Sequence, residues 1–306
     1  MEILVGHTGF VGSNLARKRT FSNIYNSKNI QDAFGTKPDL LVYSGVPAEM
    51  FLANNDPEAD RVVTENAAAN IRKINPKRLV LISTIAVLDN PVGTYEDTEI
   101  DAGKLTAYGL NRLNLERLAA DAVENCHIIR LPALFGKGIK KNFIYDMINF
   151  FPALLNETKY SEFSAKESTV ADSYILQSNG FYKLNVTDDN KSELKAAFER
   201  LNFSALNFTD SRSKYQFYNL ANLWSHIEIV IKHEIPLLHT ATEPISAADL
   251  YAFVFGKPFN NELTETPFDY DYRSKYAELF DGENGYISSK EKMLAEVKKF
   301  IRELIK

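Results

Sequence analysis

The chain has 306 residues, of which 45% are hydrophobic and 12% aromatic, enough apolar material for a large core in one or two domains. Its formal net charge is -5, with charges of both signs spread along the sequence, so no basic block suggests nucleic-acid binding. We expect a cytoplasmic protein, because no apolar run is long enough to span a membrane and no signal peptide precedes the first predicted strand. Cys126 is the single cysteine, so we expect no internal disulfide. Neither nucleic acid nor a membrane is expected as a partner.

The first fifteen residues carry the strongest local motif of the chain. Residues 3–5 form a short apolar run typical of a buried parallel strand, and three glycines follow at G-x-x-G-x-x-G spacing. We expect Gly6 to allow a sharp turn, Gly9 to let backbone N–H groups approach a pyrophosphate, and Gly12 to let the following helix pack closely. A helix N-terminus presents unpaired N–H groups to an anion. The motif therefore predicts a dinucleotide-binding loop made of Gly6, Gly9, Phe10, Val11 and Gly12.

Residues 22–26 predict a short second strand, and the residues after it bear on the choice of cofactor. In dinucleotide-binding folds an acid at this strand end binds the ribose 2′-hydroxyl and repels a 2′-phosphate. No acid is found here: Ser27 offers a hydroxyl and Lys28 a cation, which suit a 2′-phosphate better. We therefore expect a modest preference for NADP over NAD, and the alternative is that these residues only cap a helical turn that begins near Asn29.

Predicted strands and helices alternate as far as residue 136, with strands at 39–43, 78–82 and 127–132 and helices at 56–76 and 105–120. Ser44 and Thr84 each follow a strand, at the carboxyl edge where open α/β sheets bind ligands. This alternation predicts an α/β fold with a doubly wound parallel sheet of the Rossmann type.

Beyond Gly136 the alternation stops. Helices are predicted at 142–151, 192–201, 218–232, 246–256 and 289–305, and a strand at 235–240. Residues 155–208 are otherwise polar, aromatic and irregular, and 258–285 give no assignment. We expect a dinucleotide-binding core over residues 1–136, completed by part of 209–243, and a smaller C-terminal substrate-binding region over 137–208 and 244–306.

Thr84, Tyr108 and Arg112 are the candidate catalytic group. Tyr108 and Arg112 are four residues apart and share one face of a predicted helix. A phenol with a pKa of about 10 is a poor acid or base at neutral pH, but a nearby cation favours its phenolate and a hydroxyl can orient it. Such a tyrosine can move a proton to or from a sugar hydroxyl or a carbonyl while a nicotinamide moves the hydride.

These motifs resemble the extended short-chain dehydrogenase/reductase superfamily, in particular its NAD-dependent epimerase/dehydratase-like branch. The glycine loop, Thr84 and Tyr108 stand where that family has its glycine loop, its Ser/Thr after the fourth strand and the Tyr of its Tyr-x-x-x-Lys motif. Residues 95–98, 130–136 and, more loosely, 238–250 also resemble the family. The resemblance implies an NAD(P)-dependent epimerase, dehydratase or reductase acting on a nucleotide-linked sugar, with Thr84 binding the reacting oxygen and Tyr108 transferring the proton.

One position departs from the family pattern, because Arg112 stands where the family has lysine. In the family that lysine binds the nicotinamide ribose and lowers the pKa of the tyrosine. Arginine keeps the charge and the donors but cannot give up a proton. Two hypotheses stay open: an enzyme in which Arg112 holds the ribose and the phenolate, and a catalytically impaired dinucleotide-binding regulatory or scaffold protein.

The resemblance also implies two substrate contacts. Asn142 stands where nucleotide-sugar members contact the base, although a helix cap accounts for it equally well. Arg212 would reach a diphosphate, with a solvated surface arginine as the alternative. The histidines show no metal-ligand spacing, so no metal is expected. The expected partner is a small-molecule substrate, and a homodimer is one assembly that the sequence leaves open.

Overall fold

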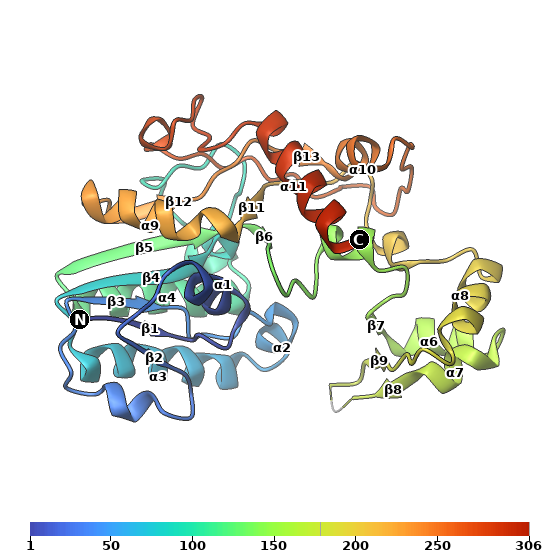
Figure 1. Cartoon of the computed structure of the whole chain (residues 1–306), viewed down its shortest axis with the longest axis horizontal. Helices are drawn as coiled ribbons and strands as arrows, with labels where there is room; N and C mark the ends of the chain where they lie inside the picture. The colour runs from blue at the N-terminus through green and yellow to red at the C-terminus, as the bar shows by residue number, and fades with distance from the viewer. Residues whose placement is uncertain (178, 306) are drawn as a thin grey trace. The chain divides into compact units, whose positions relative to one another are not determined.

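The computed structural model describes residues 1–177 and 179–305, which fold into two compact units (Figure 1). The first unit consists of Met1–Ile139, Lys214–Ile245 and Asp269–Val297. The second consists of Lys140–Ser213, Ser246–Phe268 and the described residues from Lys298 onward. The stretch Asp269–Val297 thus lies in the first unit, whereas the sequence-based division grouped it with the substrate-binding region.

The first unit is built on one parallel sheet. Its strands are β1 (Glu2–Val5), β2 (Asn23–Tyr25), β3 (Leu40–Tyr43), β4 (Arg78–Thr84), β5 (Asn125–Leu131) and β12 (Leu237–His239). They lie in the order β12-β5-β4-β3-β1-β2, and each neighbouring pair is parallel. The connection reverses direction at β1, so the carboxyl ends of β1 and β3 flank the switch point at which such sheets bind ligands. The predicted doubly wound α/β fold is confirmed.

Helices cover both faces of this sheet (Figure 1). They are α1 (Phe10–Lys18), α3 (Pro57–Ile74), α4 (Ala107–Ala122) and α9 (Leu223–Lys232), while α2 (Met50–Asn55) packs against α3 and α4. Successive strand residues point to opposite faces, so Ile3 and Val5 share a core with α3 and α4, while Leu4 shares one with α1 and α9. The sheet is therefore closed to water on both sides, as a parallel sheet requires.

The ends of α3 follow from local sequence. The carboxylate of Asp56 accepts a hydrogen bond from the Ala59 N–H at 3.0 Å, and Pro57 occupies the first turn, where its missing N–H costs nothing. Asn75 ends the helix in the left-handed conformation with φ of 56°, just before Pro76. These signals fix the start of α3, and with it the place of the residues in its first turn.

The segment 218–232, predicted as one helix, is not a single helix. It consists of the end of β11 (Phe217–Asn219), η5 (Leu220–Asn222) and α9. β11 pairs in parallel with β6 (Ala133–Phe135), and Tyr218 lies opposite Leu134. The prediction was wrong because this pairing with a distant strand overrides the helical spacing of the apolar residues.

Shorter elements complete the first unit. They are η1 (Ile30–Ala33), η2 (Ile85–Val87), η3 (Ala102–Lys104), η6 (Ala277–Phe280) and β10 (Lys214–Tyr215). β13 (Ile245–Ser246) and α11 (Lys290–Ile305) each continue from a first-unit segment into a second-unit segment.

The second unit has a core of its own, in which Phe151, Phe163 and Phe198 are buried together. Its strands β7 (Leu154–Leu155), β8 (Tyr174–Leu176) and β9 (Tyr182–Leu184) form an antiparallel sheet in the order β7-β9-β8. Its helices are α5 (Phe143–Ile148), α6 (Glu157–Ser164), α7 (Ser168–Ser173), α8 (Lys191–Arg200), η4 (Ala205–Phe208) and α10 (Ala247–Phe255). Residues 155–208 are therefore more regular than predicted, because these elements are too short to show a period in the sequence.

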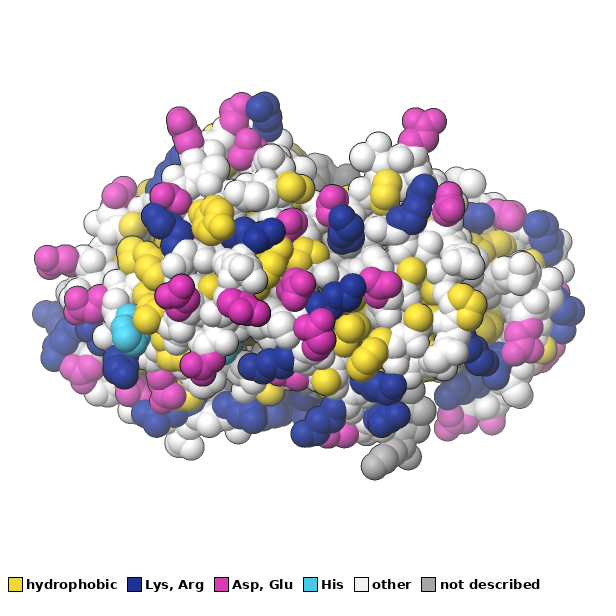
Figure 2. Space-filling model, turned by 90° about the horizontal axis from the view of Figure 1, so that it is seen from above, with side chains coloured by type: hydrophobic (Ala, Val, Ile, Leu, Met, Phe, Trp, Pro, Cys, Tyr) yellow, Lys and Arg dark blue, Asp and Glu magenta, His cyan; other side chains and the backbone are white. Residues whose placement is uncertain are grey.

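The surface carries charges of both signs. Figure 2 shows Lys and Arg side chains mixed with Asp and Glu side chains over one face of the molecule, with hydrophobic side chains scattered between them. Within the described part of the chain, no helix is both long enough and apolar enough to span a bilayer.

Candidate active site

The glycine loop packs against the segment that follows β3. Gly6 has a φ of +93°, and a Cβ built on it would lie 2.5 Å from the carbonyl oxygen of Ser44. A Cβ on Gly12 would lie 2.2 Å from the carbonyl oxygen of Gly6. Ser44 is held there because both its N–H and its hydroxyl donate to the carbonyl of Val5, each at 2.9 Å. Only glycine at positions 6 and 12 permits this close approach of strand, loop and helix.

Gly9 differs from the other two glycines because it faces outward. It is exposed, and a Cβ on it would approach only the Gly6 carbonyl, at 3.3 Å. It is the N-cap of α1, where no side chain caps the helix, so the first N–H groups, including those of Phe10 and Val11, lack intrahelical partners. An uncapped helix N-terminus beside an outward-facing glycine fits a dinucleotide pyrophosphate.

The turn after β2 carries the predicted cofactor-selecting residues. Two asparagines shape it: the Asn26 carboxamide accepts from the Lys28 N–H at 2.9 Å, and the Asn29 carboxamide accepts from the Asn26 N–H at 2.8 Å. Asn29 is the N-cap residue of η1, but no side chain donates or accepts a capping hydrogen bond there. The side chains of Ser27 and Lys28 are exposed. The turn is thus fixed by its asparagines, which leaves the hydroxyl and the ammonium group at its surface.

Tyr108 is brought to the end of β4 by a close contact of α4. A Cβ on Gly109 would lie 2.3 Å from the carbonyl oxygen of Ala86, so only glycine lets α4 approach the residues after Thr84 this closely. The Tyr108 N–H donates to the side-chain oxygen of Asn54 at 2.9 Å, which ties α4 to α2. The guanidinium carbon of Arg112 lies 4.3 Å from the centroid of the Tyr108 ring.

Competing effects act on the phenol of Tyr108. Burial is the largest and raises its pKa above the ordinary value. Arg112, through its charge and hydrogen bonding, and the Thr84 side chain, through hydrogen bonding, lower the pKa, whereas the charge of Asp60 raises it. The phenol is therefore neutral at physiological pH, and it is placed to give up a proton rather than to take one.

Asp60 is a residue of this group that the sequence did not reveal. Its carboxylate accepts two hydrogen bonds from the Arg112 guanidinium, each 2.9 Å long, and a third from the Asn111 amide at 2.9 Å. Arg112 also donates to the carbonyl oxygen of Pro47 at 2.8 Å. Asp60 and Arg112 lie in different helices, so no local pattern in the sequence pairs them.

The segment 44–47 connects the two halves of the site. Ser44 touches the glycine loop, and Pro47 accepts from Arg112. The glycine loop and the Tyr108–Arg112 pair therefore lie on either side of one short segment of the first unit, next to the switch point of the sheet.

A second buried charge cluster lies further along α4. Glu116 of α4 accepts from the Arg130 guanidinium through both carboxylate oxygens, at distances of 2.6 to 3.2 Å, and it also accepts from the hydroxyl of Ser83. Arg130 in turn contacts His239 Nε2 at 3.2 Å, and burial lowers the pKa of His239 to about 4. This cluster joins β4, β5, β12 and α4, and it uses Ser83 structurally, so that Thr84 is the hydroxyl next to Tyr108.

The two predicted substrate contacts belong to the second unit. Asn142 is the N-cap of α5, with φ of 89°, and its carboxamide accepts from the N–H groups of Ile144 and Tyr145. Arg212 pairs with Asp210 and Glu262, and its side chain is 40% exposed. Both residues therefore have structural partners that account for their positions.

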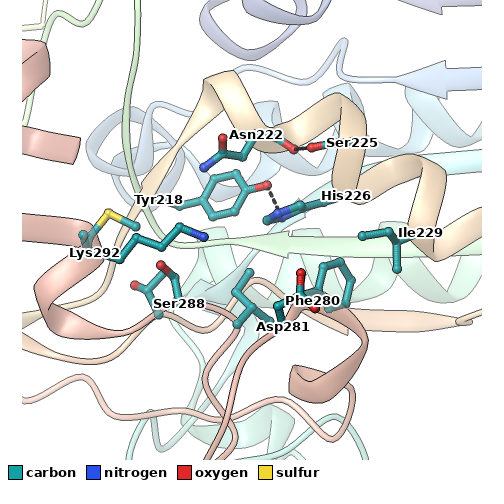
Figure 3. A pocket seen from close by; sticks show the side chains of 12 residues that line it. Tyr218, Asn222, Ser225, His226, Ile229, Phe280, Asp281, Ser288 and Lys292 are labelled. Carbon is teal, nitrogen blue, oxygen red and sulfur yellow. Dashed lines mark hydrogen bonds between the residues drawn. The ribbon is translucent and has the colours of Figure 1, made fainter. Parts of the chain in front are cut away.

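A separate cavity of about 270 Å³ lies in the first unit between β11, α9 and the start of α11 (Figure 3). On its wall the hydroxyl of Tyr218 and Nδ1 of His226 are 2.8 Å apart, and the ammonium group of Lys292 points toward this pair. Burial lowers the pKa of His226 to about 4. None of the predicted site residues lines this cavity. The described residues contain no group of three or more His, Cys, Asp or Glu side chains arranged to hold a metal ion.

Several solved structures share this fold. A dTDP-4-dehydrorhamnose reductase from Yersinia enterocolitica is 15% identical, with 98% of each chain covered and a TM-score of 0.62. The dTDP-4-dehydrorhamnose reductase from Bacillus anthracis str. Ames, in complex with NADP, is 14% identical, with 99% of each chain covered and a TM-score of 0.64. A UDP-N-acetylglucosamine 4-epimerase from Methanobrevibacter ruminantium M1, in complex with UDP-N-acetylmuramic acid, is 11% identical, covers 100% of this chain and 99% of its own, and has a TM-score of 0.63.

At these identities the structural matches establish the fold alone. No curated protein matches the chain. The model of one protein family, the RmlD substrate binding domain, matches residues 1–155, which is just over half of the chain and includes the glycine loop, Thr84, Tyr108 and Arg112. The chain belongs to the RmlD substrate-binding-domain family, and its fold is that of the extended short-chain dehydrogenase/reductases that include nucleotide-sugar reductases and epimerases.

Proposed function

We propose that the protein is an NAD(P)-dependent oxidoreductase of the reductase, epimerase or dehydratase type, and that it acts on a nucleotide-linked sugar. The observation that carries this proposal is the neutral phenol of Tyr108, packed under the guanidinium of Arg112 beside Thr84. The family and the fold support the same reading. Two of the structures that share the fold are named for dTDP-4-dehydrorhamnose and one for UDP-N-acetylglucosamine, which makes a dTDP- or UDP-linked sugar the first choice of substrate.

The chemistry that these residues support best is the reduction of a carbonyl. A bound nicotinamide supplies the hydride. The Tyr108 hydroxyl donates its proton to the carbonyl oxygen, which becomes the alcohol, while the Thr84 hydroxyl binds that oxygen. Arg112 stabilises the phenolate that Tyr108 becomes, until solvent returns the proton. Because burial keeps Tyr108 protonated, reduction needs no prior ionisation, whereas oxidation of an alcohol would require the phenolate first.

One observation favours the alternative of a dinucleotide-binding regulatory or scaffold protein. Three of the five N–H groups of the Arg112 guanidinium already donate, two to Asp60 and one to Pro47. An arginine occupied in this way has fewer donors for a ribose than the family's lysine has. Such a protein would bind the cofactor without turning over a sugar.

Turnover separates the two functions. The protein is incubated with NADPH or NADH and a panel of dTDP- and UDP-linked keto sugars, and nicotinamide absorbance is followed together with the sugar product. Oxidation of the nicotinamide in step with formation of a reduced sugar supports the enzyme. Measurable cofactor binding with no product from any sugar of the panel would favour the regulatory function.

Cofactor binding at the glycine loop is tested by Gly9→Val. The larger side chain stands where the pyrophosphate approaches, while the protein offers it only a 3.3 Å contact, so the fold should survive and cofactor affinity should fall at least about tenfold, or ~1.4 kcal/mol. Gly103→Val is the matched control, because that exposed glycine also has a single 3.3 Å contact but lies outside the loop. Titration calorimetry that finds equal affinities in the two variants would contradict the assignment.

The preference for NADP rests on Ser27 and Lys28. A charge-assisted hydrogen bond to a phosphate contributes roughly 1.5–3 kcal/mol, and exposure reduces this, so we expect NADP to bind about tenfold more tightly than NAD at moderate salt. Lys28→Asp should reverse the preference. Lys299→Asp, an equal change of charge at an exposed position of α11, should leave the ratio unaltered. An unaltered ratio in Lys28→Asp would show that this turn does not select the cofactor.

A further inference from the structure

The arginine in the family's lysine position is held by an acid. Both terminal nitrogens of Arg112 donate to Asp60, each at 2.9 Å and to a different carboxylate oxygen, so the contact is a planar two-bond clamp. The side chains are 5% and 11% exposed, respectively. A pair with two bonds and little solvent fixes both the position and the plane of the guanidinium, which one bond would not do.

Asp60 is itself anchored from the other side. It lies in the first turn of α3, whose N-terminus favours a carboxylate, and the Asn111 amide donates to it at 2.9 Å. The same amide donates to the carbonyl oxygen of Pro57 at 3.1 Å. The carboxylate of Asp60 is therefore held by contacts other than Arg112, and α3 positions the guanidinium through this carboxylate.

The clamp leaves a defined part of Arg112 available. After the bonds to Asp60 and Pro47, the Nε–H and one Nη1–H group are not used by these two acceptors. The guanidinium carbon is 4.3 Å from the centroid of the Tyr108 ring. An unclamped arginine has a long and flexible side chain, whereas here the charge stays at one place beside the phenol.

We propose that Asp60 is a positioning residue that enables Arg112 to act where the family uses lysine, by fixing the guanidinium against Tyr108. In this arrangement an arginine–aspartate pair replaces a single lysine. The proposal rests on the proposed function for its catalytic meaning, but its geometric part concerns Asp60, Arg112 and Tyr108 whether or not the protein turns over a sugar.

The clamp has an electrostatic consequence at Tyr108. The groups that act on its phenol besides burial are Arg112 of α4, Thr84 of β4 and Asp60 of α3. The arginine lowers the pKa of Tyr108 and the aspartate raises it, and the arginine has the larger effect. Removing one charge or both should therefore move this pKa in a fixed order.

The order is measured with 3-fluorotyrosine placed at position 108, whose single ¹⁹F resonance reports ionisation of that phenol alone in the full chain. We expect the pKa to rise through the series wild type, Asp60→Asn, the double variant Asp60→Asn/Arg112→Gln, and Arg112→Gln, because a released guanidinium lowers the pKa less. An Asp60 that acted by its charge alone would instead place Asp60→Asn below wild type. Glu58→Gln removes another first-turn acid of α3 that pairs with Arg61, and it should leave the pKa unchanged.

Cofactor affinity is the second measurement, and it tests whether Asp60 acts through Arg112. Asp60→Asn should weaken NADP binding up to about tenfold in titration calorimetry, because the guanidinium is no longer held in place. Arg112→Gln and the double variant should bind with the same affinity as each other, because Asp60 has nothing left to position. Asp60→Glu keeps the charge but moves the carboxylate, so it should retain a pKa near wild type and still weaken binding.

The outcomes are distinguishable. If Asp60→Asn does not fold, the double variant, which leaves no unpaired buried charge, is compared with wild type, and its pKa must be higher. A pKa of Tyr108 that ignores these changes, or losses of affinity that add in the double variant, would overturn the positioning role. The expected order in a protein without turnover would keep the positioning role and remove the proposed enzyme function instead.

Discussion

Two buried tyrosines of the first unit each have a basic partner, and they differ in the charge of that partner. Tyr218 is 1% exposed, and its hydroxyl lies 2.8 Å from Nδ1 of His226. Burial raises the pKa of Tyr218 well above its ordinary value and lowers that of His226 to about 4, so this pair is neutral at physiological pH. Tyr108 is 5% exposed, but its partner Arg112 keeps its charge because guanidinium does not deprotonate in proteins.

The comparison shows how the surroundings of Tyr108 differ from those of a tyrosine that lines a cavity. The cavity of about 270 Å³ adjoins Tyr218 and His226, and burial lowers the pKa of this histidine so that it is neutral. Tyr108 keeps a charged partner, because Asp60 compensates the charge of Arg112 without taking a proton from it. Tyr108 is the phenol in direct contact with a clamped guanidinium, which makes it the candidate acid.

The largest expected effect comes from exchanging the two phenols for phenylalanine. Tyr108→Phe should reduce turnover by roughly 100- to 10,000-fold, the usual contribution of a general acid, with cofactor affinity nearly unchanged. Tyr218→Phe removes only a hydrogen bond to His226 and should leave turnover at the wild-type level. The two rates are measured with the same sugar substrate, and a loss in Tyr218→Phe as large as that in Tyr108→Phe would break the comparison.

The next effect concerns the charge that distinguishes the pairs. Arg112→Met leaves the buried carboxylate of Asp60 without its cation, which should lower the free energy of unfolding by about 3–5 kcal/mol. Arg61→Met, on α3, removes an arginine whose side chain is 46% exposed in its pairs with Glu58 and Glu65, and its loss should be far smaller. Chemical denaturation of both variants checks this. Equal losses would mean that the Arg112–Asp60 pair is no more buried in solution than a surface pair.

The sequence predicted those features that are set by residues close to one another in the chain. The strand, loop and helix around the glycines and the start of α3 depend on residues within a few positions of each other, such as Asp56 and Pro57, and these elements lie where they were predicted. Asp60 was missed because its partner Arg112 lies in another helix, and the pairing exists only after α3 and α4 pack side by side. Tyr218 was placed in a helix because its strand exists only through pairing with β6.

The roles of the predicted site residues follow the same division. Gly6 and Gly12 were recognised because their spacing is local, and the close contacts that they permit explain their identity. The assignments of Asn142 and Arg212 came from resemblance alone, and both have structural partners within the second unit. Their contact with a substrate therefore stays a prediction, because a cap and a surface ion pair explain them without one.

The smallest effect in this series concerns acid and the neutral state of His226. Its pKa is about 4 in the folded protein and 6.5 when unfolded, so between these values the unfolded chain binds the proton more tightly, and stability falls as the pH drops. The arithmetic of linkage gives a loss of about 2 kcal/mol in the free energy of unfolding between pH 7 and pH 5.

His226→Gln removes this group, so the free energy of unfolding of the variant should fall by about 2 kcal/mol less than that of wild type over the same interval in denaturant titrations. His239, whose pKa is also about 4, is present in both proteins and cancels in the difference. His233→Gln, at an exposed position, should reproduce the wild-type slope. If His226→Gln also loses as much stability as wild type between pH 7 and pH 5, then His226 is not held neutral by burial, and the contrast with Arg112 fails at that point.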